Sequence, residues 1–316
     1  MIRKFLVAGL FAVALAPGAA LAAYPEKPVN YIIAFNPGGE SDIAARFQQT
    51  YWEKLTAQQL VIQYQAGAGG AQAWSQLNKM EGDGYTIMGT NLPHTVLQPL
   101  EKAVGYQADD LTHVYFFHYT PDAIFVPANS QFKSLKDLVD YAKKNPGMVT
   151  FSGSGSNTSN HLAQQRFDEM AGTKTTYVPF SGTAPAMTAV LGSQVMAGFN
   201  YSTSAINAGD KVRVLAVASE ERMPNFPDTP TFRELGFDLV GGAYRGIAVP
   251  KSTPEERRKE VSAVIDKINK DPGFIKQMQD AGFVLTNIGY DQMDKFMAER
   301  KKFYTDIATK MGIVKK

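Results

Sequence analysis

The sequence predicts an α/β protein of two lobes, each with a mainly parallel sheet flanked by helices, and a cleft between them. Two separate series of alternating strands and helices indicate this class, because a strand–helix–strand order gives parallel strands joined by right-handed crossovers. The chain has 316 residues, more than one hydrophobic core usually organises. Glycine-rich turns follow strands of both series. Since ligands of open α/β sheets bind where the strands end, these turns should line the cleft.

The first series contains three strands and two helices. The strands are 29–35, 59–65 and 85–90. After the first strand, Ile43, Phe47 and Tyr51 recur at helical spacing and predict one apolar helix face. A second helix follows the loop "AGAGG". The order of these elements predicts one parallel sheet.

The second series follows a less regular middle segment. Two strands flank Pro121, where we expect the chain to cross between the lobes. Ser134 is the expected N-cap of the next helix. The strands expected after residue 110 are 113–119, 122–128, 149–155, 175–180, 195–200, 212–219 and 245–250. Beyond residue 250 the pattern predicts helices. The first lobe is therefore expected to be discontinuous, with residues 23–121 and 222–316, and the second to contain residues 122–221.

Residues 1–22 have the pattern of a secretory signal peptide. Arg3 and Lys4 form a basic head, an apolar run follows, and "ALA" supplies small residues for cleavage. The apolar run is about a dozen residues long, too short for a membrane-spanning anchor. We expect cleavage near Ala22 or Ala23, export to the periplasm, and a soluble mature protein.

Charge and cysteine content exclude several classes of protein. The chain has 32 basic and 30 acidic residues, and removal of Arg3 and Lys4 leaves 30 of each. A neutral chain without a basic run has no electrostatic footprint for nucleic acid or acidic membranes. Cysteine is absent, so the fold has no disulfide and the protein cannot be lipidated at a cleavage-site cysteine.

The first candidate site is the loop "FNPGGESD", residues 35–42. A glycine turn that leads into a helix places unpaired N–H groups and the positive end of the helix dipole at one spot. Asn36, Gly38, Gly39 and Ser41 could therefore bind a carboxylate or phosphate. Alternatively, the segment is a tight turn in which Asp42 caps the helix. Two acids are too few for a calcium loop.

The second candidate is the loop "YQAGAGGAQAW", residues 64–74. Gly67 and Gly69 begin a dinucleotide fingerprint, but Gln72 stands where glycine or alanine is required, and the partner acid about twenty residues on is missing. NAD binding is therefore excluded, and we expect no cofactor. The glycines instead leave room for a ligand beside the Ala71 amide.

Three further turns come from the second series. "FSGSGSNTSNH", residues 151–161, offers small polar groups at a strand end, and "VPFSGTAPA" places Gly182 and Thr183 before a helix. Asn200 and Tyr201 end another strand. The serines suggest a hydrolase, but no G-x-S-x-G pattern and no acid–histidine pair accompanies them. His161, one turn into its helix, is either an ordinary helix residue or a ligand-binding group.

These motifs resemble one family of bacterial receptors. "YPEKPVNYIIAFNPGGESDIAAR", "GAGGAQAW", "DGYTIMGT", "FSGSGSNTSNHLAQQRFDEMAG" and "YVPFSGTAPAMTAVLGSQV" occur in order over nearly the whole chain. They are similar to the periplasmic substrate-binding proteins of tripartite tricarboxylate transporters, the Bug family. The resemblance implies a type II periplasmic-binding-protein fold, a small carboxylate ligand and a membrane permease as partner.

The resemblance also implies a set of ligand-binding residues. Loops 35–42 and 69–71 would hold one carboxylate, partly through water, and the facing lobe would complete the site. In that family the acid at Asp42 is a structural cap. With Thr183, Asn200 and Tyr201 added from the turns described above, the expected ligand-binding residues are Phe35, Asn36, Gly38, Gly39, Glu40, Ser41, Asp42, Gly69, Gly70, Ala71, Thr90, Asn91, Ser152, Ser154, Ser156, Asn157, His161, Thr183, Asn200 and Tyr201.

Glu40 departs from the family pattern, in which a small or neutral residue is commoner. Two positions are open for it. Its side chain either faces solvent at the cleft mouth, or enters the cleft and accepts a hydrogen bond from a ligand hydroxyl or ammonium. The second position would favour a hydroxy or amino acid over a plain diacid.

The sequence therefore predicts a monomeric periplasmic receptor that performs no chemistry and binds no metal. Its lobes would close on an organic carboxylate, and the permease would recognise the closed form. Two rivals remain open: a sensor module that presents the ligand to a signalling receptor, and an exported serine hydrolase that depends on Ser154.

Overall fold

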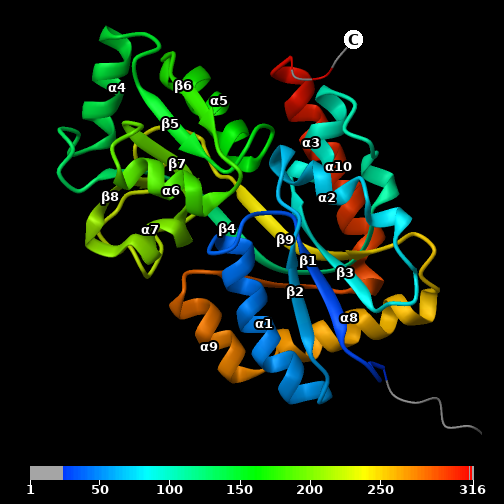
Figure 1. Ribbon diagram of the computed structural model, residues 1–316. Helices are drawn as coiled ribbons and strands as arrows, with labels where there is room; N and C mark the ends of the chain where they lie inside the picture. Colours follow the sequence, from blue (N-terminus) through cyan, green and yellow to red (C-terminus); the bar gives the residue numbers. More distant parts are fainter. Residues whose placement is uncertain (1–23, 313, 315–316) are drawn as a thin grey trace, which may run out of the picture.

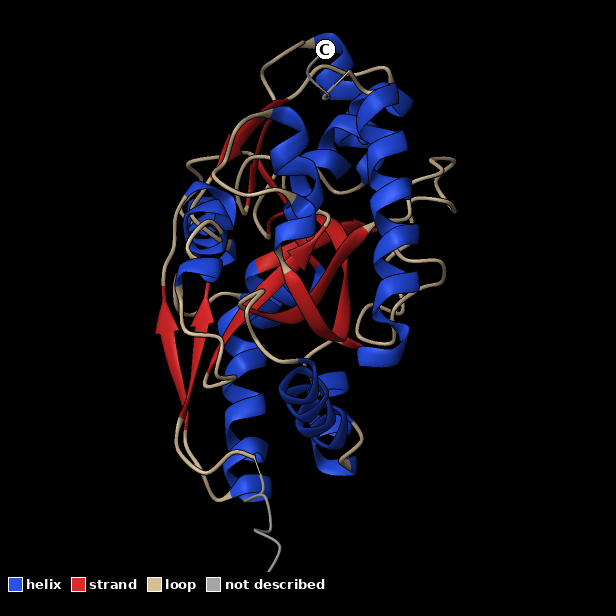
Figure 2. Ribbon diagram, turned by 90° about the vertical axis from the view of Figure 1, so that its right-hand side faces the viewer, coloured by secondary structure: helices blue, strands red, loops and turns tan. Residues whose placement is uncertain are grey.

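The computed structural model describes residues 24–312 and 314. The expected signal peptide lies outside the described residues. Ten strands run in the order β2-β1-β3-β9-β4-β7-β5-β6, with β8 and β10 also paired to β4. Figure 1 shows two lobes, with β4 and β9 running between them, and Figure 2 shows helices packed around the twisted strands. No helix among the described residues is long and apolar enough to span a membrane.

Lobe 1 is built on strands at both ends of the chain. Its strands are β1 (Val29–Ile33), β2 (Leu60–Tyr64), β3 (Thr86–Leu92), β10 (Val284–Ile288) and the lobe 1 parts of β4 (Thr112–Pro127) and β9 (Gly242–Val249). Its helices are α1 (Glu40–Thr56), α2 (Ala71–Trp74), α3 (His94–Glu101), α8 (Glu255–Asn269), α9 (Pro272–Asp280) and α10 (Met293–Lys310). The first three strands are parallel, as predicted.

Lobe 2 contains the middle of the chain. Its strands are β5 (Thr150–Gly153), β6 (Thr176–Pro179), β7 (Ala197–Tyr201) and β8 (Val212–Val217), and its helices are α4 (Leu135–Lys144), α5 (Ser159–Ala171), α6 (Thr183–Leu191) and α7 (Ser202–Ala208). β5 pairs in parallel with β6 and β7. The segment that follows β8 places Met223, Phe232 and Leu239 in the cores of lobe 2, beyond the boundary expected after residue 221.

The crossing differs from the prediction of two strands around Pro121. β4 is one continuous strand whose first half pairs with β9 and β10, and whose second half pairs with β7 and β8. Register shifts along β4 let one strand serve both sheets. A continuous strand thus takes the place of a loop at the crossing, and residues 119–123 of β4 lie between the lobes.

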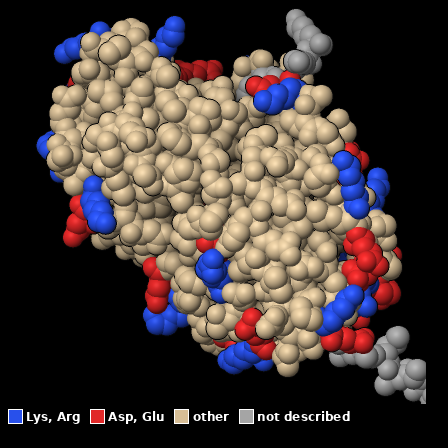
Figure 3. Space-filling model, viewed as in Figure 1, with Lys and Arg blue, Asp and Glu red and all other residues tan. Residues whose placement is uncertain are grey.

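Separate hydrophobic cores hold the two lobes. The lobe 1 core contains Trp52, Trp74 and Tyr115, all at most 1 % exposed. In lobe 2, Phe199 stacks on Phe232 with ring centroids 6.1 Å apart. On the face seen in Figure 3, acidic and basic side chains are interspersed at the periphery, as expected for a chain with balanced charge.

Candidate ligand-binding cleft

The loop before α1 forms one wall of the cleft. Gly38 adopts a left-handed conformation with φ +76°, which favours glycine, and its N–H donates to Asp42 Oδ2 at 2.7 Å. Tyr64 donates to the other carboxylate oxygen of Asp42 at 2.6 Å. The N-cap of α1 is Gly39 rather than Asp42. Asp42 therefore holds the loop from inside the helix, and both its oxygens are used there.

The second glycine loop lies beside the first. Gly69 and Gly70 have positive φ values, and a Cβ on Gly70 would lie 2.4 Å from the Trp74 ring. Gln98 Nε2 donates to Gly69 O at 2.9 Å, and Ala71 is buried where α2 begins. These contacts fix the loop between β2 and α2, the segment that the sequence indicates as the second candidate site.

Lobe 2 contributes the ends of β5 and β7. The backbone N–H and the hydroxyl of Ser154 both donate to Asn160 Oδ1, at 3.1 and 2.6 Å. Asn160 in turn donates to Asp122 Oδ1 at 2.6 Å. Asn200 Oδ1 accepts from the N–H of Tyr201, and the Tyr201 hydroxyl bonds Ser159 Oγ at 3.0 Å. Buried side-chain hydrogen bonds therefore fix this wall.

The two lobes are closed on each other. Asn36 Nδ2 donates to Ser181 Oγ at 2.7 Å, and the N–H of Glu40 donates to Thr183 Oγ1 at 2.9 Å. The Tyr201 hydroxyl lies 3.3 Å from Nε2 of the lobe 1 residue His94. Each contact joins a lobe 1 loop or helix to a lobe 2 loop or strand end, so the cleft surfaces predicted from separate glycine turns do face each other.

Glu40 is buried, so of the two positions left open for its side chain, the one that faces solvent is wrong. The residue is 3 % exposed, and its carboxylate pairs with Arg245 of β9 and accepts from the Thr120 hydroxyl. Burial alone would raise the pKa of Glu40, but Arg245, the nearby His118 ring and the hydrogen bond from Thr120 hold that pKa below its usual value. Glu40 is buried because it is the first residue of α1, and this end of the helix points at the crossing strands β4 and β9.

Closure leaves small spaces inside the cleft and a larger one at its mouth. Two inner cavities of about 10 Å³ each border Arg245, and each has room for one water molecule. The mouth holds a cavity of about 230 Å³, lined by residues that include Gly69, Ser156 and Asn157. The expected binding residues that border the inner cavities are Phe35, Gly39, Glu40, Ser41, Asn91, Ser154, Thr183 and Tyr201.

Several expected binding residues lie outside the cleft or are used structurally. Thr90 bonds His113 Nδ1 at 3.1 Å, because neighbours in a strand face opposite sides and Asn91 faces the cleft. Ser152 donates to Ala186 O on the α6 side. His161 accepts from the N–H of Asn157 and stacks on Tyr177.

Arg245 and His94 border the cleft but were missed by sequence reasoning. His94 begins α3 with a fully buried side chain. Arg245 is 3 % exposed within the otherwise apolar strand "GAYRGIAV". An arginine inside a buried strand is rare unless it is paired. Its position in the sequence could therefore have indicated a buried partner for Arg245.

A family model for the tripartite tricarboxylate transporter family receptor matches residues 43–313. The chain belongs to this family. The receptor is 30 % identical to a protein from the tcbD-tcbE intergenic region of Pseudomonas sp. strain P51, over 83 % of this chain and 80 % of that one. It is 26 % identical to BugT of Bordetella pertussis, over 99 % and 98 %.

The solved structures agree with this membership. The periplasmic binding protein BugD is 26 % identical and superposes with a TM-score of 0.86, covering 93 % of the receptor and all of BugD. The expected two-lobed α/β fold and the resemblance to Bug receptors are therefore confirmed. The family consists of receptors, which is the class that the resemblance implied.

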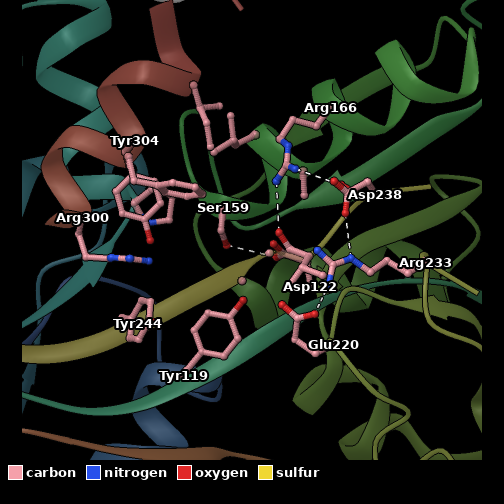
Figure 4. A pocket seen from close by; sticks show the side chains of 18 residues that line it. Tyr119, Asp122, Ser159, Arg166, Glu220, Arg233, Asp238, Tyr244, Arg300 and Tyr304 are labelled. Atoms are coloured by element: carbon pink, nitrogen blue, oxygen red, sulfur yellow. Dashed lines mark hydrogen bonds and ion pairs between the residues drawn. The ribbon is translucent and has the colours of Figure 1, made fainter. Parts of the chain in front are cut away.

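The receptor also has a rear cavity of about 520 Å³ behind the crossing strands. Figure 4 shows Tyr119, Tyr244 and Tyr304 on one side of it, and Arg166 and Arg233 on the other. Tyr244 and Arg245 are neighbours in β9 and point to opposite faces, so this cavity is separate from the cleft. Arg233 is paired with acidic side chains, and Arg166 donates to backbone carbonyls. Arg300 lines the same cavity, together with the acidic side chains of Asp122, Glu220 and Asp238, so basic and acidic groups are mixed there.

The geometry around Ser154 does not assemble a hydrolase site. Its hydroxyl donates to an amide oxygen of Asn160, which cannot act as a general base. Among the described residues, no group of three or more potential ligand side chains could hold a metal ion.

Asp122, between cleft and rear cavity, should make stability depend on pH. Burial raises the pKa of this carboxyl to about 7, above its ordinary value in an unfolded chain. The folded state therefore binds the extra proton, and the stabilisation is complete at low pH and is lost as pH rises through 7. In the parent protein, the free energy of unfolding should fall by about 2 kcal/mol between pH 5 and pH 8 because of this group. We expect the Asp122→Asn variant to lack this fall.

Urea denaturation of both proteins at the two pH values measures this difference. Asp228→Asn, at an exposed position, is the matched control and should follow the parent protein. An Asp122→Asn protein whose unfolding free energy falls as steeply as that of the parent would show that another group titrates.

Proposed function

We propose that the protein is a monomeric periplasmic receptor that captures a small organic carboxylate between its lobes and delivers it to a membrane permease of a tripartite tricarboxylate transporter. Closure of the two lobes on each other is the observation that carries this proposal. The turn before α1, the loop at Gly69 and the starts of α5 and α6 meet at one place. Their N–H groups would donate hydrogen bonds to an anion.

Ligand entry requires the lobes to separate. Cavities of about 10 Å³ are too small for a carboxylic acid of several carbon atoms. The crossing strands β4 and β9 are the natural hinge, since they connect the lobes. The open and closed forms then differ in the Asn36–Ser181 and Glu40–Thr183 hydrogen bonds, and the ligand stabilises the closed form to the extent that it binds it better.

Relatives with this fold suggest which ligands to test. Two solved structures from Rhodopseudomonas palustris, at 23 % and 24 % identity, hold adipate and malate respectively. We take both acids as members of a panel with citrate, succinate, aromatic acids and amino acids.

A thermal-shift screen of residues 23–316 tests the proposal. A carboxylate at a hundred times its dissociation constant should add about 2.7 kcal/mol of stability and raise the Tm by roughly 5 °C or more. Succinamide, which has the size of succinate without its charge, is the matched control and should give no shift. Unchanged melting with every carboxylate of the panel would contradict the proposed function. Genomic neighbours that encode a histidine kinase rather than permease subunits would favour a sensor.

A further inference from the structure

Arg245 is a buried arginine whose hydrogen-bonding groups are only partly used. Its Nη2 pairs with Glu40, and its guanidinium lies over the Tyr201 ring, 4.6 Å from the centroid. Nε and Nη1 have no hydrogen-bond partner in the part of the chain that the structure describes. A buried donor without an acceptor destabilises the protein, because it has lost its hydrogen bond to water. Arg245 borders both inner cavities of the cleft, so an acceptor would reach it from there.

Each of these cavities is also bordered by one other unpaired group, Asn91 in one and His94 in the other. Asn91 Nδ2 and His94 Nδ1 are buried and have no partner among the described residues. Burial, followed by the charge of Arg245, holds the pKa of His94 well below its usual range, so its ring is neutral. The planar fork of a guanidinium matches a carboxylate in a bidentate arrangement. The free donors of Arg245, which lines both cavities, therefore fit one carboxylate group of a ligand, with Asn91 or His94 as a further donor on one side.

Glu40 adds a negative charge at the same place. It borders the inner cavity beside Arg245, and its charge offsets that of the guanidinium. A second carboxylate there would be repelled rather than neutralised. A hydroxyl or ammonium group would instead donate to Glu40, because each carboxylate oxygen can accept more than one hydrogen bond.

We propose that Arg245 and Glu40 form a selectivity site in which the arginine binds a ligand carboxylate and the glutamate accepts from a hydroxyl or amino group on the adjacent carbon. The receptor then selects 2-hydroxy or 2-amino carboxylates over analogues without that group. This inference rests on the proposed function, since it requires a carboxylate in the cleft. It assigns the selectivity to this pair and not to the glycine loops.

Calorimetric titration with matched ligand pairs tests the assignment. Malate against succinate and glutamate against glutarate differ only by the hydroxyl or amino group. We expect the donor-bearing member to bind at least tenfold more tightly to the native protein. In Glu40→Gln, succinate and glutarate should bind more tightly than to the native protein, and the preference should fall at least fivefold. Arg245→Lys should weaken both members at least tenfold and leave their ratio unchanged.

Two controls keep the test decisive. Circular dichroism establishes that each variant is folded. If Glu40→Gln does not fold, Glu40→Asp replaces it, since aspartate keeps the charge but is shorter by one methylene. The preference of Glu40→Asp for the donor-bearing ligands should also fall. An equal ratio in native and Glu40 variants, or no preference in the native protein, would overturn the inference while leaving the carboxylate receptor intact. If no carboxylate binds the native protein, the proposed function falls as well.

Discussion

Replacing Arg245 with methionine should lower the free energy of unfolding by about 3–5 kcal/mol. Methionine fills a similar volume but leaves the Glu40 carboxylate, which is 1 % exposed, without its counter-charge. Breaking one side of a buried ion pair typically costs this much because an uncompensated charge stays buried. Urea denaturation at pH 7.5, followed by circular dichroism, measures the loss.

The double variant Glu40→Gln/Arg245→Met is the matched control. With no charge on either side, most of the lost stability should return, since replacing a whole buried pair is often neutral. Glutamine can still accept from the Thr120 hydroxyl, the bond that Glu40 makes in the native protein. Equal destabilisation of the single and double variants would mean that Arg245 contributes packing and not charge.

Gly39→Val should weaken ligand binding about a hundredfold, or roughly 2.7 kcal/mol. A Cβ on Gly39 would lie 2.7 Å from Thr183 Oγ1 of lobe 2, whereas the backbone of Gly39, with φ −86° and ψ 176°, is extended and suits valine. The substitution should therefore disfavour closure of the two lobes more than it disfavours folding of either lobe. Calorimetry with the tightest carboxylate measures affinity, and small-angle scattering should show a larger radius of gyration.

Thr183→Ala in the same chain tests the cause of this effect. Removing the hydroxyl relieves the collision, so the double variant should recover about tenfold in affinity, although it loses the bond from the Glu40 N–H. Native affinity in Gly39→Val would contradict binding by lobe closure at this contact.

Much of the fold could be predicted because its strands are buried and bounded by turns. β1 and β2 fall within the expected ranges 29–35 and 59–65. β10 was missed because its five residues are partly exposed and pair with a strand more than 160 residues earlier. The pattern of α3 is interrupted by Pro99, which argues against a helix when the sequence is read alone.

The sequence could predict only those parts of the site that are formed by residues close together in the chain. Glycine turns are visible in a short window, and loops 35–42 and 67–71 lie where the sequence placed them. The partner of Glu40 is separated from it by 205 residues, and no periodicity connects the two positions. Strand parity could have excluded Thr90 once Asn91 was assigned to the cleft, because the two residues are neighbours in β3.

A crystal structure with the tightest ligand of the panel would show whether a carboxylate binds between the lobes. We expect the ligand carboxylate to be enclosed by loops 35–42 and 67–71 of lobe 1 and the start of α6 in lobe 2. A ligand found instead in the rear cavity beside Tyr119 and Tyr304 would contradict it.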